Sequence, residues 1–459
     1  MLRQDTIAAI ATPFGMSGIG IIRMSGPEAL AIARRIFQPS SGKCKWQSHQ
    51  LYHGDIVSAD TRTILDEVLI SFMQSPRSFT GEDVVEINCH GNPFIIEAIL
   101  TQLQEMGCRM ARPGEFSERA FLNNRLDLSQ AEALATMISA KSVKAYAMGL
   151  AQLKGSLSKE IEDLRSLLIE ALSGLEASID FTEDTSGESI PEVPLQIDQA
   201  IERMRKLLSS YSAARAYTEG IHVTITGKPN VGKSSLLNAL TGRKKAIVTD
   251  IPGTTRDLIT DTITVNGIPV HIMDTAGIRE PQNVIEQEGI SLVWESLAQA
   301  DVVIVMLDVS KPLTDEDKMI MDKNNSGKII VAINKIDLPC AWDQKTIAQR
   351  FPPETSIMEI SAKSGIGLPE LKKSIIDLSV GHELADSSRK VITNLRHKLA
   401  LEKACENIQH AKESIASGLS FEFTSFDLRE ALDNLDEITG RKMNDEILDK
   451  IFSSFCIGK

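Results

Sequence analysis

Apolar residues change their spacing along the chain, and these changes divide it into regions of different expected structure. Short apolar runs at residues 6–11, 20–24 and 84–88 are typical of strands, and residues 27–37 are typical of a helix. Glycine and proline separate these runs. Residues 1–118 are therefore predicted to form a small α+β domain.

Helical spacing takes over after residue 118. Ser129 and Glu132 form the pattern of a capping box at the start of an alanine-rich helix. Farther along, apolar residues recur every three or four positions, which marks the buried face of a long helix. These residues are Ile161, Leu164, Leu168, Leu172, Leu175 and Ile179. The polar stretch 181–194 contains two prolines and is expected to be a loop, followed by a helix that ends near Tyr217.

Short buried runs alternate with helical segments between residues 221 and 380. A parallel sheet covered by helices on both faces gives this pattern, because its strands are buried on both sides. The expected strands are residues 222–226, 270–274, 302–307, 329–334 and 358–361.

The chain becomes helical again after about residue 385. An apolar stripe precedes Gly440, which is expected to end its helix. The stripe consists of Leu428, Ala431, Leu432, Leu435 and Ile438. A separate C-terminal bundle is one interpretation, but neither helical half is large enough for a stable bundle alone. We therefore predict one discontinuous helical domain, 119–217 with 382–459, interrupted by an α/β domain at 218–381.

Composition limits the classes of function. The 459 residues carry a net charge of −13, so the chain does not coat nucleic acid by bulk electrostatics and needs a local basic patch or a partner to handle RNA. No apolar run approaches the roughly 20 residues of a membrane helix. The N-terminus does not have the pattern of a secretory signal, and the six cysteines form no C-x-x-C pair. A cytoplasmic protein with reduced thiols is expected.

Residues 227–234 read Gly-Lys-Pro-Asn-Val-Gly-Lys-Ser and fit the phosphate-binding pattern G-x-x-x-x-G-K-[ST]. The motif follows an expected strand and opens an expected helix, so backbone N–H groups and the helix dipole meet at the phosphates. Lys233 is predicted to reach the β and γ phosphates, and the hydroxyl of Ser234 to bind Mg²⁺.

Two further motifs follow in the order that a GTPase needs. Residues 254–257 read Thr-Thr-Arg-Asp, and Thr255 is predicted to supply a second hydroxyl to Mg²⁺. Residues 274–277 read Asp-Thr-Ala-Gly at a strand end. Asp274 would hold the water shell of the metal, and the N–H of Gly277 would meet the γ phosphate.

Asn334, Lys335 and Asp337 form the base-recognition motif at the end of another strand. The Asp337 carboxylate can accept hydrogen bonds from guanine N1–H and N2–H₂, a pair that adenine lacks. Residues 361–363, Ser-Ala-Lys, supply a backbone N–H for guanine O6. Each motif alone is also consistent with a turn at a strand end, but four in order predict a GTPase.

The departures from Ras-like proteins are informative as well. Ile278 stands where those proteins have the glutamine that orients the attacking water, so another group must orient it. No side chain is an evident arginine finger. Arg256 and Arg279 are nearby candidates, and a solvated loop cation is the alternative for each.

Several stretches of the chain resemble the MnmE (TrmE) family of tRNA-modification GTPases, and the resemblance covers the whole chain. These stretches are the P-loop with Asn230, residues 254–257 and 274–279, residues 77–83 and 111–123, and the C-terminal Cys456-Ile-Gly-Lys459 preceded by Phe452-Ser-Ser-Phe455. The C-terminal motif is highly specific to that family.

The resemblance implies an α/β and α+β multidomain fold. It comprises an N-terminal α+β folate-binding and dimerising domain, a discontinuous helical domain and an inserted Ras-like P-loop G domain. It also implies a homodimer that acts in the cytoplasm with the FAD-dependent partner MnmG, in a heterotetramer-type complex on tRNA. The implied product is a carboxymethylaminomethyl-type group at C5 of the wobble uridine, position 34, with the one-carbon unit from 5-formyl- or 5,10-methylene-tetrahydrofolate.

Residue roles in the G domain transfer by motif. The resemblance implies potassium ligands at Asn230, Thr249, Ile251 and Thr254, beside the Mg²⁺ ligands Ser234 and Thr255. Glu286 matches the acid that positions water, and its neighbour Glu288 is the competing candidate. The expected GTP-binding residues are Asn230, Val231, Gly232, Lys233, Ser234, Ser235, Thr249, Asp250, Ile251, Pro252, Gly253, Thr254, Thr255, Asp274, Thr275, Ala276, Gly277, Asn334, Lys335, Asp337, Ser361, Ala362 and Lys363.

For folate, the resemblance implies contacts from Arg23, Glu82, Arg125 and Lys459. The family often has lysine at the position of Arg125, which keeps the charge and changes the geometry. Cys456 has two interpretations: a thiol nucleophile, or a residue that positions or packs the chain end.

Two rival functions remain at the level of sequence. A ribosome-assembly GTPase of the Era/Der kind shares the G-domain motifs, but no KH-type G-x-x-G module or second P-loop follows here. A stand-alone folate-dependent one-carbon transferase that uses GTP only as a regulator is the other rival.

Overall fold

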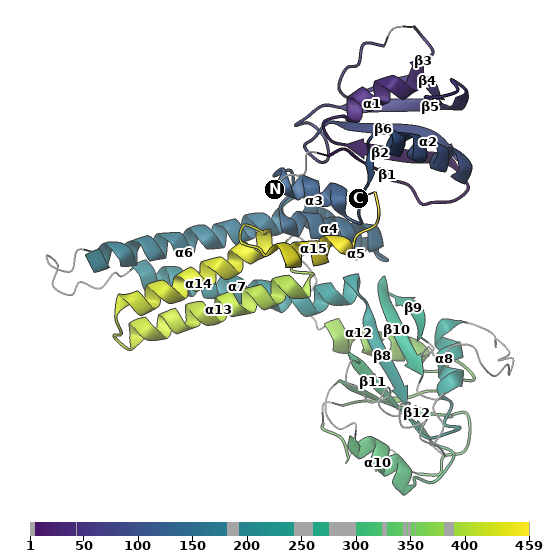
Figure 1. Cartoon of the computed structure of the whole chain (residues 1–459). Coiled ribbons are helices and arrows are strands. Elements are labelled where there is room, and N and C mark those ends of the chain that lie inside the picture. The colour runs from purple at the N-terminus through teal and green to yellow at the C-terminus, as the bar shows by residue number, and fades with distance from the viewer. Residues whose placement is uncertain are drawn as a thin grey trace, which may run out of the picture. The chain divides into compact units, whose positions relative to one another are not determined.

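The structure is a computed structural model of the whole chain (Figure 1). It describes residues 5–42, 44–180, 192–242, 260–274, 300–323, 328–342, 347, 350–353, 355–380 and 390–458. The chain divides into two compact units, and each is made of separate stretches of sequence. The first comprises residues 1–135, 152–201 and 400–459, and the second comprises residues 136–151 and 202–399.

The N-terminal part of the first unit is a seven-stranded sheet in the order β3-β4-β5-β6-β2-β1-β7. Neighbouring strands are antiparallel except β1 and β7, which are parallel. The strands are β1 (Ile7–Ile10), β2 (Ser17–Ser25), β3 (Phe37–Pro39), β4 (Gln50–Val57), β5 (Ile64–Met73), β6 (Val84–Gly91) and β7 (Arg109–Met110).

Helices α1 (Ala29–Ile36) and α2 (Pro93–Glu105) cover one face of this sheet. Alternation along the strands explains why: Val68 and Ile70 of β5 point into the core beneath the helices, whereas Leu69 is exposed on the opposite face. The side chain of Asn92 caps α2 by accepting from the N–H of Phe94, and Pro93 opens the helix. Helices α1 and α2 therefore cover one face, whereas the opposite face packs against Phe116 at β1 and is open at β4 and β5.

The rest of the first unit is helical. Helix α6 packs along α14, and Arg165 of α6 lies 2.6 Å from Asp436 of α14. Lys412 of α13 lies 2.5 Å from Asp198 of α7, which pairs a segment near the end of the chain with one from its middle. The helices are α3 (Glu115–Leu122), α4 (Leu128–Ser139), α6 (Ser156–Asp180), α7 (Glu192–Thr218), α13 (Leu395–Ala416), α14 (Phe421–Thr439) and α15 (Asp445–Ser453), and α4, α7 and α13 continue into the second unit.

Two details of the helical prediction are wrong. Helix α4 begins at Leu128 and its cap is Asp127, whose carboxylate accepts from the N–H of Gln130 at 3.0 Å, so Ser129 lies inside the helix. Asp127 caps as well as serine does and comes two residues earlier. The loop expected to reach Pro194 ends sooner, because α7 begins at Glu192 and a proline fits the first turn of a helix.

The second unit contains a six-stranded sheet in the order β13-β12-β11-β8-β10-β9, and only β9 is antiparallel to its neighbour. The strands are β8 (Ile221–Thr226), β9 (Thr260–Val265), β10 (Ile268–Asp274), β11 (Val302–Asp308), β12 (Ile329–Asn334) and β13 (Ser356–Glu359). The last strand lies two residues earlier than the expected 358–361.

Helices cover both faces of this sheet. Ile304 and Met306 of β11 face a core shared with α8 (Lys233–Thr241), α12 (Leu368–Val380) and α5 (Val143–Leu153). Val305 and Leu307 face the opposite core, which includes Met321 of α10 (Asp315–Lys323). Burial on both faces is why these strands read as continuous apolar runs.

The expected fold class is confirmed: an N-terminal α+β part, a discontinuous helical part and an inserted α/β part with a P-loop. Within the part of the chain that the structure describes, none of the helices has the length and apolar character to cross a membrane.

Candidate functional site

The P-loop connects β8 to α8 and turns sharply at Gly232. Gly232 has a φ of 107°, in the left-handed region, and a Cβ on it would lie 2.3 Å from Nδ2 of Asn334. Glycine is therefore required here both by its backbone conformation and by the close approach of Asn334. Asn230 also has a positive φ, 66°, which asparagine tolerates better than most residues.

Lys233 opens helix α8 and is buried. Its ammonium lies within the loop and donates to the carbonyl oxygens of Gly227 at 2.5 Å and Lys228 at 2.8 Å. Ser234 and Ser235 follow in the first turn of α8 and are exposed. The structure therefore brings the loop backbone, one ammonium and two hydroxyls to the N-terminus of a helix, the arrangement that binds phosphate and its metal ion.

Asn334 ties the P-loop to the base-recognition motif. It ends β12, and its side chain is almost fully buried, at 2% exposed. Its amide nitrogen donates to the carbonyl of Val231 at 2.8 Å, and its amide oxygen accepts from the N–H of Ala362 at 2.9 Å. One side chain thus fixes the P-loop, the end of β12 and the segment after β13 relative to one another.

Lys335 makes a second connection. Its ammonium donates to the carbonyl of Asn230 at 2.9 Å and lies 2.6 Å from the carboxylate of Asp308. Burial works to raise the pKa of Asp308, but hydrogen bonds from Lys335 and Ser310 outweigh it and hold that pKa below its ordinary value. Asp308 ends β11 and was not among the predicted site residues; its position at the end of a buried strand was the available signal.

Asp337 is exposed and lies just after β12. The hydroxyl of Ser361 donates to its carboxylate at 2.7 Å and holds the pKa of Asp337 below its ordinary value. Ser361 also accepts from the N–H of Ser364, at 3.1 Å, so residues 361–364 form a tight turn next to this carboxylate. An ionised carboxylate in this place can accept two N–H groups of a base.

Asp274 is described only by its backbone, which ends β10 next to β8. The remaining predicted residues of this site lie outside the described residues. Those outside are Thr249, Asp250, Ile251, Pro252, Gly253, Thr254, Thr255, Thr275, Ala276, Gly277 and Glu286, together with the alternatives Arg256, Arg279 and Glu288.

A second candidate site surrounds the segment between β5 and β6 in the first unit. Arg23 of β2 pairs with Glu86 of β6 at 2.7 Å, and its guanidinium lies over the ring of Phe79, 5.5 Å from the centroid. Arg23 also donates to the carbonyl of Gly458 at 3.3 Å. Gly458, the last described residue, therefore lies next to Arg23, and Lys459 is outside the described residues.

Glu82 and Arg125 contact the same segment. The Glu82 carboxylate accepts from the hydroxyl of Ser25 at 2.7 Å and from Arg119 at 3.1 Å. Arg125 donates from Nε to the carbonyl of Ser78 at 3.1 Å. The structure thus brings Arg23, Glu82 and Arg125, which are far apart in sequence, to residues 78–82.

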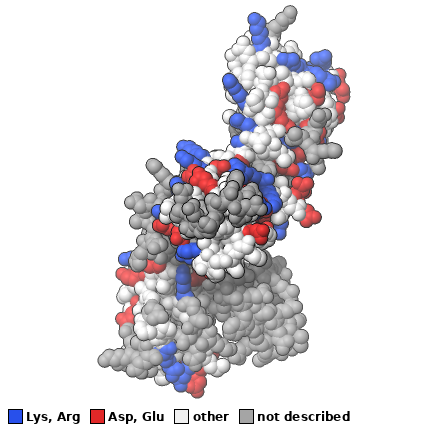
Figure 2. All heavy atoms as spheres, turned by 90° about the vertical axis from the view of Figure 1, so that its left-hand side faces the viewer, with Lys and Arg blue, Asp and Glu red and all other residues white. Residues whose placement is uncertain are grey.

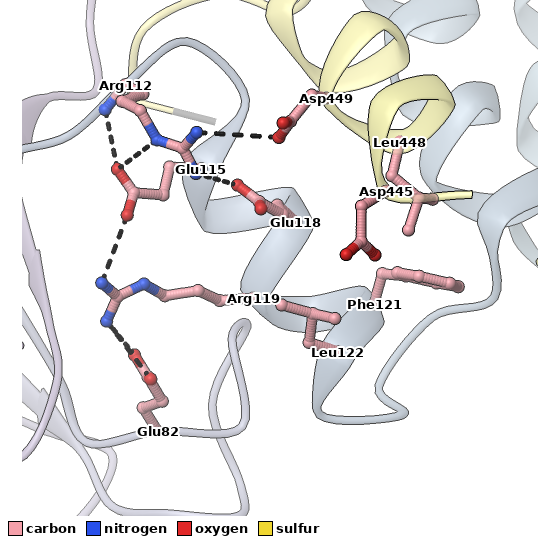
Figure 3. Close-up of a pocket in the computed structure, with 10 residues that line it drawn as sticks. All are labelled: Glu82, Arg112, Glu115, Glu118, Arg119, Phe121, Leu122, Asp445, Leu448 and Asp449. Atoms are coloured by element: carbon pink, nitrogen blue, oxygen red, sulfur yellow. Dashed lines mark hydrogen bonds and ion pairs between the residues drawn. The ribbon is translucent and has the colours of Figure 1, made fainter. Parts of the chain in front are cut away.

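Glu82 lines a pocket of about 380 Å³ between α3 and α15 (Figure 3). Five carboxylates, two guanidinium groups and three apolar side chains surround it, and Figure 3 shows Arg119 between Glu82 and Glu115. Arg119 and Glu115 were not among the predicted site residues. Their spacing of four on α3, with Glu118 on the same helix and Arg112 just before it, was the signal for an ion-pair network.

The C-terminal segment lies against this network. The N–H of Gly114 donates to the carbonyl of Cys456 at 3.4 Å, and Gly458 lies so close to Ile10 that a Cβ on it would come 2.1 Å from that residue's carbonyl oxygen. The thiol of Cys456 is exposed and free. This close packing requires glycine at position 458.

The P-loop after β8, the base motif after β12 and the mainly parallel sheet that carries them define a P-loop GTPase with a guanine-recognition motif. The sequence pattern of the MnmE helical domain matches residues 128–456, and that of the GTP-binding protein TrmE N-terminus matches residues 6–125. The chain belongs to the MnmE family of tRNA modification GTPases.

Relatives match along their full length. The tRNA modification GTPase MnmE of Syntrophus aciditrophicus is 46% identical over 456 residues, which cover 99% of this chain and 100% of the relative. That of Carboxydothermus hydrogenoformans is 46% identical over 464 residues and covers all of both chains. A crystal structure of Aquifex aeolicus Era is 32% identical and covers 40% of this chain and 66% of its own, with a TM-score of 0.30. Family membership separates this chain from the ribosome-assembly GTPases.

Proposed function

We propose that this protein hydrolyses GTP to drive the modification of tRNA at C5 of the wobble uridine, position 34. The added group is of the carboxymethylaminomethyl type, and the FAD-dependent MnmG is the partner. The observation that carries the proposal is the double connection, through Asn334 and Lys335, between a P-loop and a base motif in a member of the MnmE family. Such a connection presents the phosphate and base sites as one preorganised surface.

Each nucleotide-site residue has a role in this proposal. Lys233 neutralises the β and γ phosphates, and Ser234 and Thr255 bind Mg²⁺ while Asp274 holds its water shell. Asp337 selects guanine, and the N–H groups of residues 361–363 meet O6. Glu286 orients the attacking water, the task that Ile278 cannot perform. Val231 and Gly232 meet the phosphates through their backbone, and Asn334 and Lys335 hold the base motif against the P-loop.

We further propose that potassium completes the site. Asn230, Thr249, Ile251 and Thr254 surround the ion, which neutralises charge between the phosphates as an arginine finger does elsewhere. Asn230 suits this role because it is exposed and its backbone is fixed by Lys335. Two G domains that meet face to face would enclose the ion.

Replacing potassium by sodium is expected to lower the GTPase rate by about tenfold or more, because the smaller ion fits the same ligands less well. Phosphate release measured at equal ionic strength in potassium, rubidium and sodium chloride checks this. Asn230→Ala should remove the difference between the salts, because it removes a side-chain ligand of the ion. Equal rates of the original protein in potassium and sodium would rule out the potassium site.

The N-terminal site fits a reduced folate. Pteridine rings present adjacent N–H donors, and the carboxylate of Glu82 is an acceptor held in place by Ser25 and Arg119. Arg23, Arg125 and Lys459 are the cations for the folate's carboxylates. When bound, a 5-formyl- or 5,10-methylene-tetrahydrofolate supplies the one-carbon unit. The residues of this chain bind and orient it.

We propose the domain limits 1–118, 119–217 with 382–459, and 218–381, and a homodimer formed through the N-terminal domain. The open part of its sheet supports this dimer, because Leu51 and Leu69 are 59% and 40% exposed on neighbouring strands.

On the face drawn in Figure 2, Lys and Arg side chains lie among Asp and Glu instead of forming one broad positive surface. This charge distribution supports the binding of tRNA together with a partner protein. We place the reaction in the cytoplasm.

The decisive experiment is to express this chain in a bacterial host that lacks its own MnmE and to measure the tRNA nucleosides by mass spectrometry. Return of the C5-aminomethyl-type wobble uridines is the expected result. Asp274→Ala, which removes the group that holds the metal's water shell, is expected to leave them absent at equal protein level. Absence of these nucleosides even when the chain's native MnmG is supplied would overturn the proposed function.

A further inference from the structure

The carboxylate of Asp308 lies where three segments of the second unit meet. Asp308 ends β11, and its Oδ2 lies 2.6 Å from Nζ of Lys335, which follows β12. The same ammonium donates to the carbonyl of Asn230 in the P-loop at 2.9 Å. Lys335 therefore reaches from the end of β12 to the P-loop, and Asp308 holds its ammonium group in place.

Asp308 itself is held firmly. Its Oδ1 accepts from the N–H of Ser310 at 3.0 Å and from the Ser310 hydroxyl at 2.6 Å, and the indole N–H of Trp342 donates to its backbone carbonyl at 3.2 Å. Its side chain is 7% exposed. A carboxylate with this many fixed partners does not need to reorganise when a ligand arrives.

The side chain of Lys335, by contrast, is flexible when it has no partner. A lysine side chain has four rotatable bonds, and ordering it on binding costs free energy. In this structure two contacts fix the ammonium of Lys335, the carbonyl of Asn230 and the carboxylate of Asp308. Of the two, only Asp308 carries a charge opposite to that of Lys335.

We infer that Asp308 is a positioning residue of the nucleotide site, which orders Lys335 across the P-loop before the nucleotide binds. The inference rests on the proposed function of the nucleotide site. In it Asp308 touches no part of the nucleotide and acts only through Lys335. Because neither partner of the Asp308–Lys335 pair is a group that reacts during hydrolysis, we expect Asp308 to affect nucleotide affinity more than the chemical step.

The test is a double-mutant cycle on the full chain, with Asp308→Asn, Lys335→Ala and the two combined. The dissociation constant of a fluorescent GDP analogue is measured by stopped flow, together with kcat and KM for GTP. Asp308→Asn is expected to raise the dissociation constant and KM by about five- to tenfold with kcat nearly unchanged, the cost of ordering one long side chain. In the Lys335→Ala background, the same substitution is expected to change the dissociation constant by less than about twofold.

Asp315→Asn is the matched control, because Asp315 pairs with Lys318 on the surface of α10 and touches neither motif. Ser310→Ala keeps the charge of Asp308 and removes one of its hydrogen bonds. It replaces Asp308→Asn in the cycle if that variant does not fold, and a smaller effect is then expected. Additive effects in the cycle, or an unchanged affinity in Asp308→Asn, would overturn the inference. An unchanged affinity in Lys335→Ala would overturn the proposed nucleotide site as well.

Discussion

Asp337→Asn is expected to weaken GTP and GDP binding by about 10²- to 10³-fold. The carboxylate can accept both the N1–H and the N2–H₂ of guanine, and Ser361 holds it ionised by donating to it at 2.7 Å. An asparagine of the same shape turns an NH₂ group toward one of these donors. Two donors then face each other, and a charge-assisted hydrogen bond is lost.

The same substitution is expected to improve the binding of xanthosine diphosphate, because xanthine has a carbonyl at C2 where guanine has an amino group. Dissociation constants for both diphosphates, measured by competition against a fluorescent GDP analogue, check both effects. Asp315→Asn again serves as the control, since it changes the same charge on the same unit away from the motif. A fall in affinity that is equal for guanine and xanthine nucleotides would mean that Asp337 supports the loop and does not read the base.

The nucleotide motifs could be found from sequence because each is short and its residues act on one ligand together. Gly232, Lys233 and Ser234 are adjacent in the chain, and their positions after a strand and before a helix follow from the apolar pattern. The alternation of buried runs also predicts a parallel sheet, which places the ends of β8, β11 and β12 at one edge.

The supporting residues could not be found in the same way. Asp308 is 27 positions from Lys335, and a lone acid after a strand has many uses besides this ion pair. Arg119 pairs with Asp5, which is 114 positions away, and the sequence around either residue does not indicate the other. Long-range pairs of this kind depend on the packing of separate elements, which one sequence does not reveal.

The Cys456 segment illustrates the same limit. Its sequence indicates membership of a family, but not that Cys456 contacts Gly114 and that Gly458 contacts Ile10. The structure places the backbone of Cys456 against the start of α3, with its thiol exposed. A Cys456→Ser variant in the nucleoside assay tests the two interpretations of the thiol, as a nucleophile or as a packing residue.

Glu115→Gln is expected to destabilise the N-terminal sheet and α3 by about 3 kcal/mol. Glu115 is 2% exposed in its side chain. It accepts from Arg119 at 3.3 Å and from the N–H of Arg112 at 2.8 Å (Figure 3), and also from Arg109 at 2.5 Å. A neutral amide keeps the volume but leaves the buried guanidinium of Arg119 and the half-buried one of Arg109 with one fewer anion. Hydrogen exchange of amides in β1, β2 and α3, read as opening free energies, measures the loss in the intact chain.

The effect of Glu115 is expected to depend on pH. Burial works to raise its pKa, but hydrogen bonds from Arg109 and Arg112 outweigh burial, so the pKa lies below its ordinary value of 4.5. The folded state therefore releases this proton more readily than the unfolded state. The stabilisation is fully present above the ordinary value and is lost as the pH falls through the lowered pKa.

Glu118→Gln is the matched comparison, because Glu118 lies three residues farther along α3 and pairs with Arg112 at 2.8 Å. Burial, with the nearby charges of Glu115 and Asp449, raises the pKa of Glu118, so its ionised form opposes folding at neutral pH. We expect Glu118→Gln to leave the opening free energies unchanged or slightly higher at pH 7. The two variants thus differ in sign although both remove one carboxylate from the same pocket, and equal losses from both would show that net charge matters there more than the particular ion pairs of Glu115.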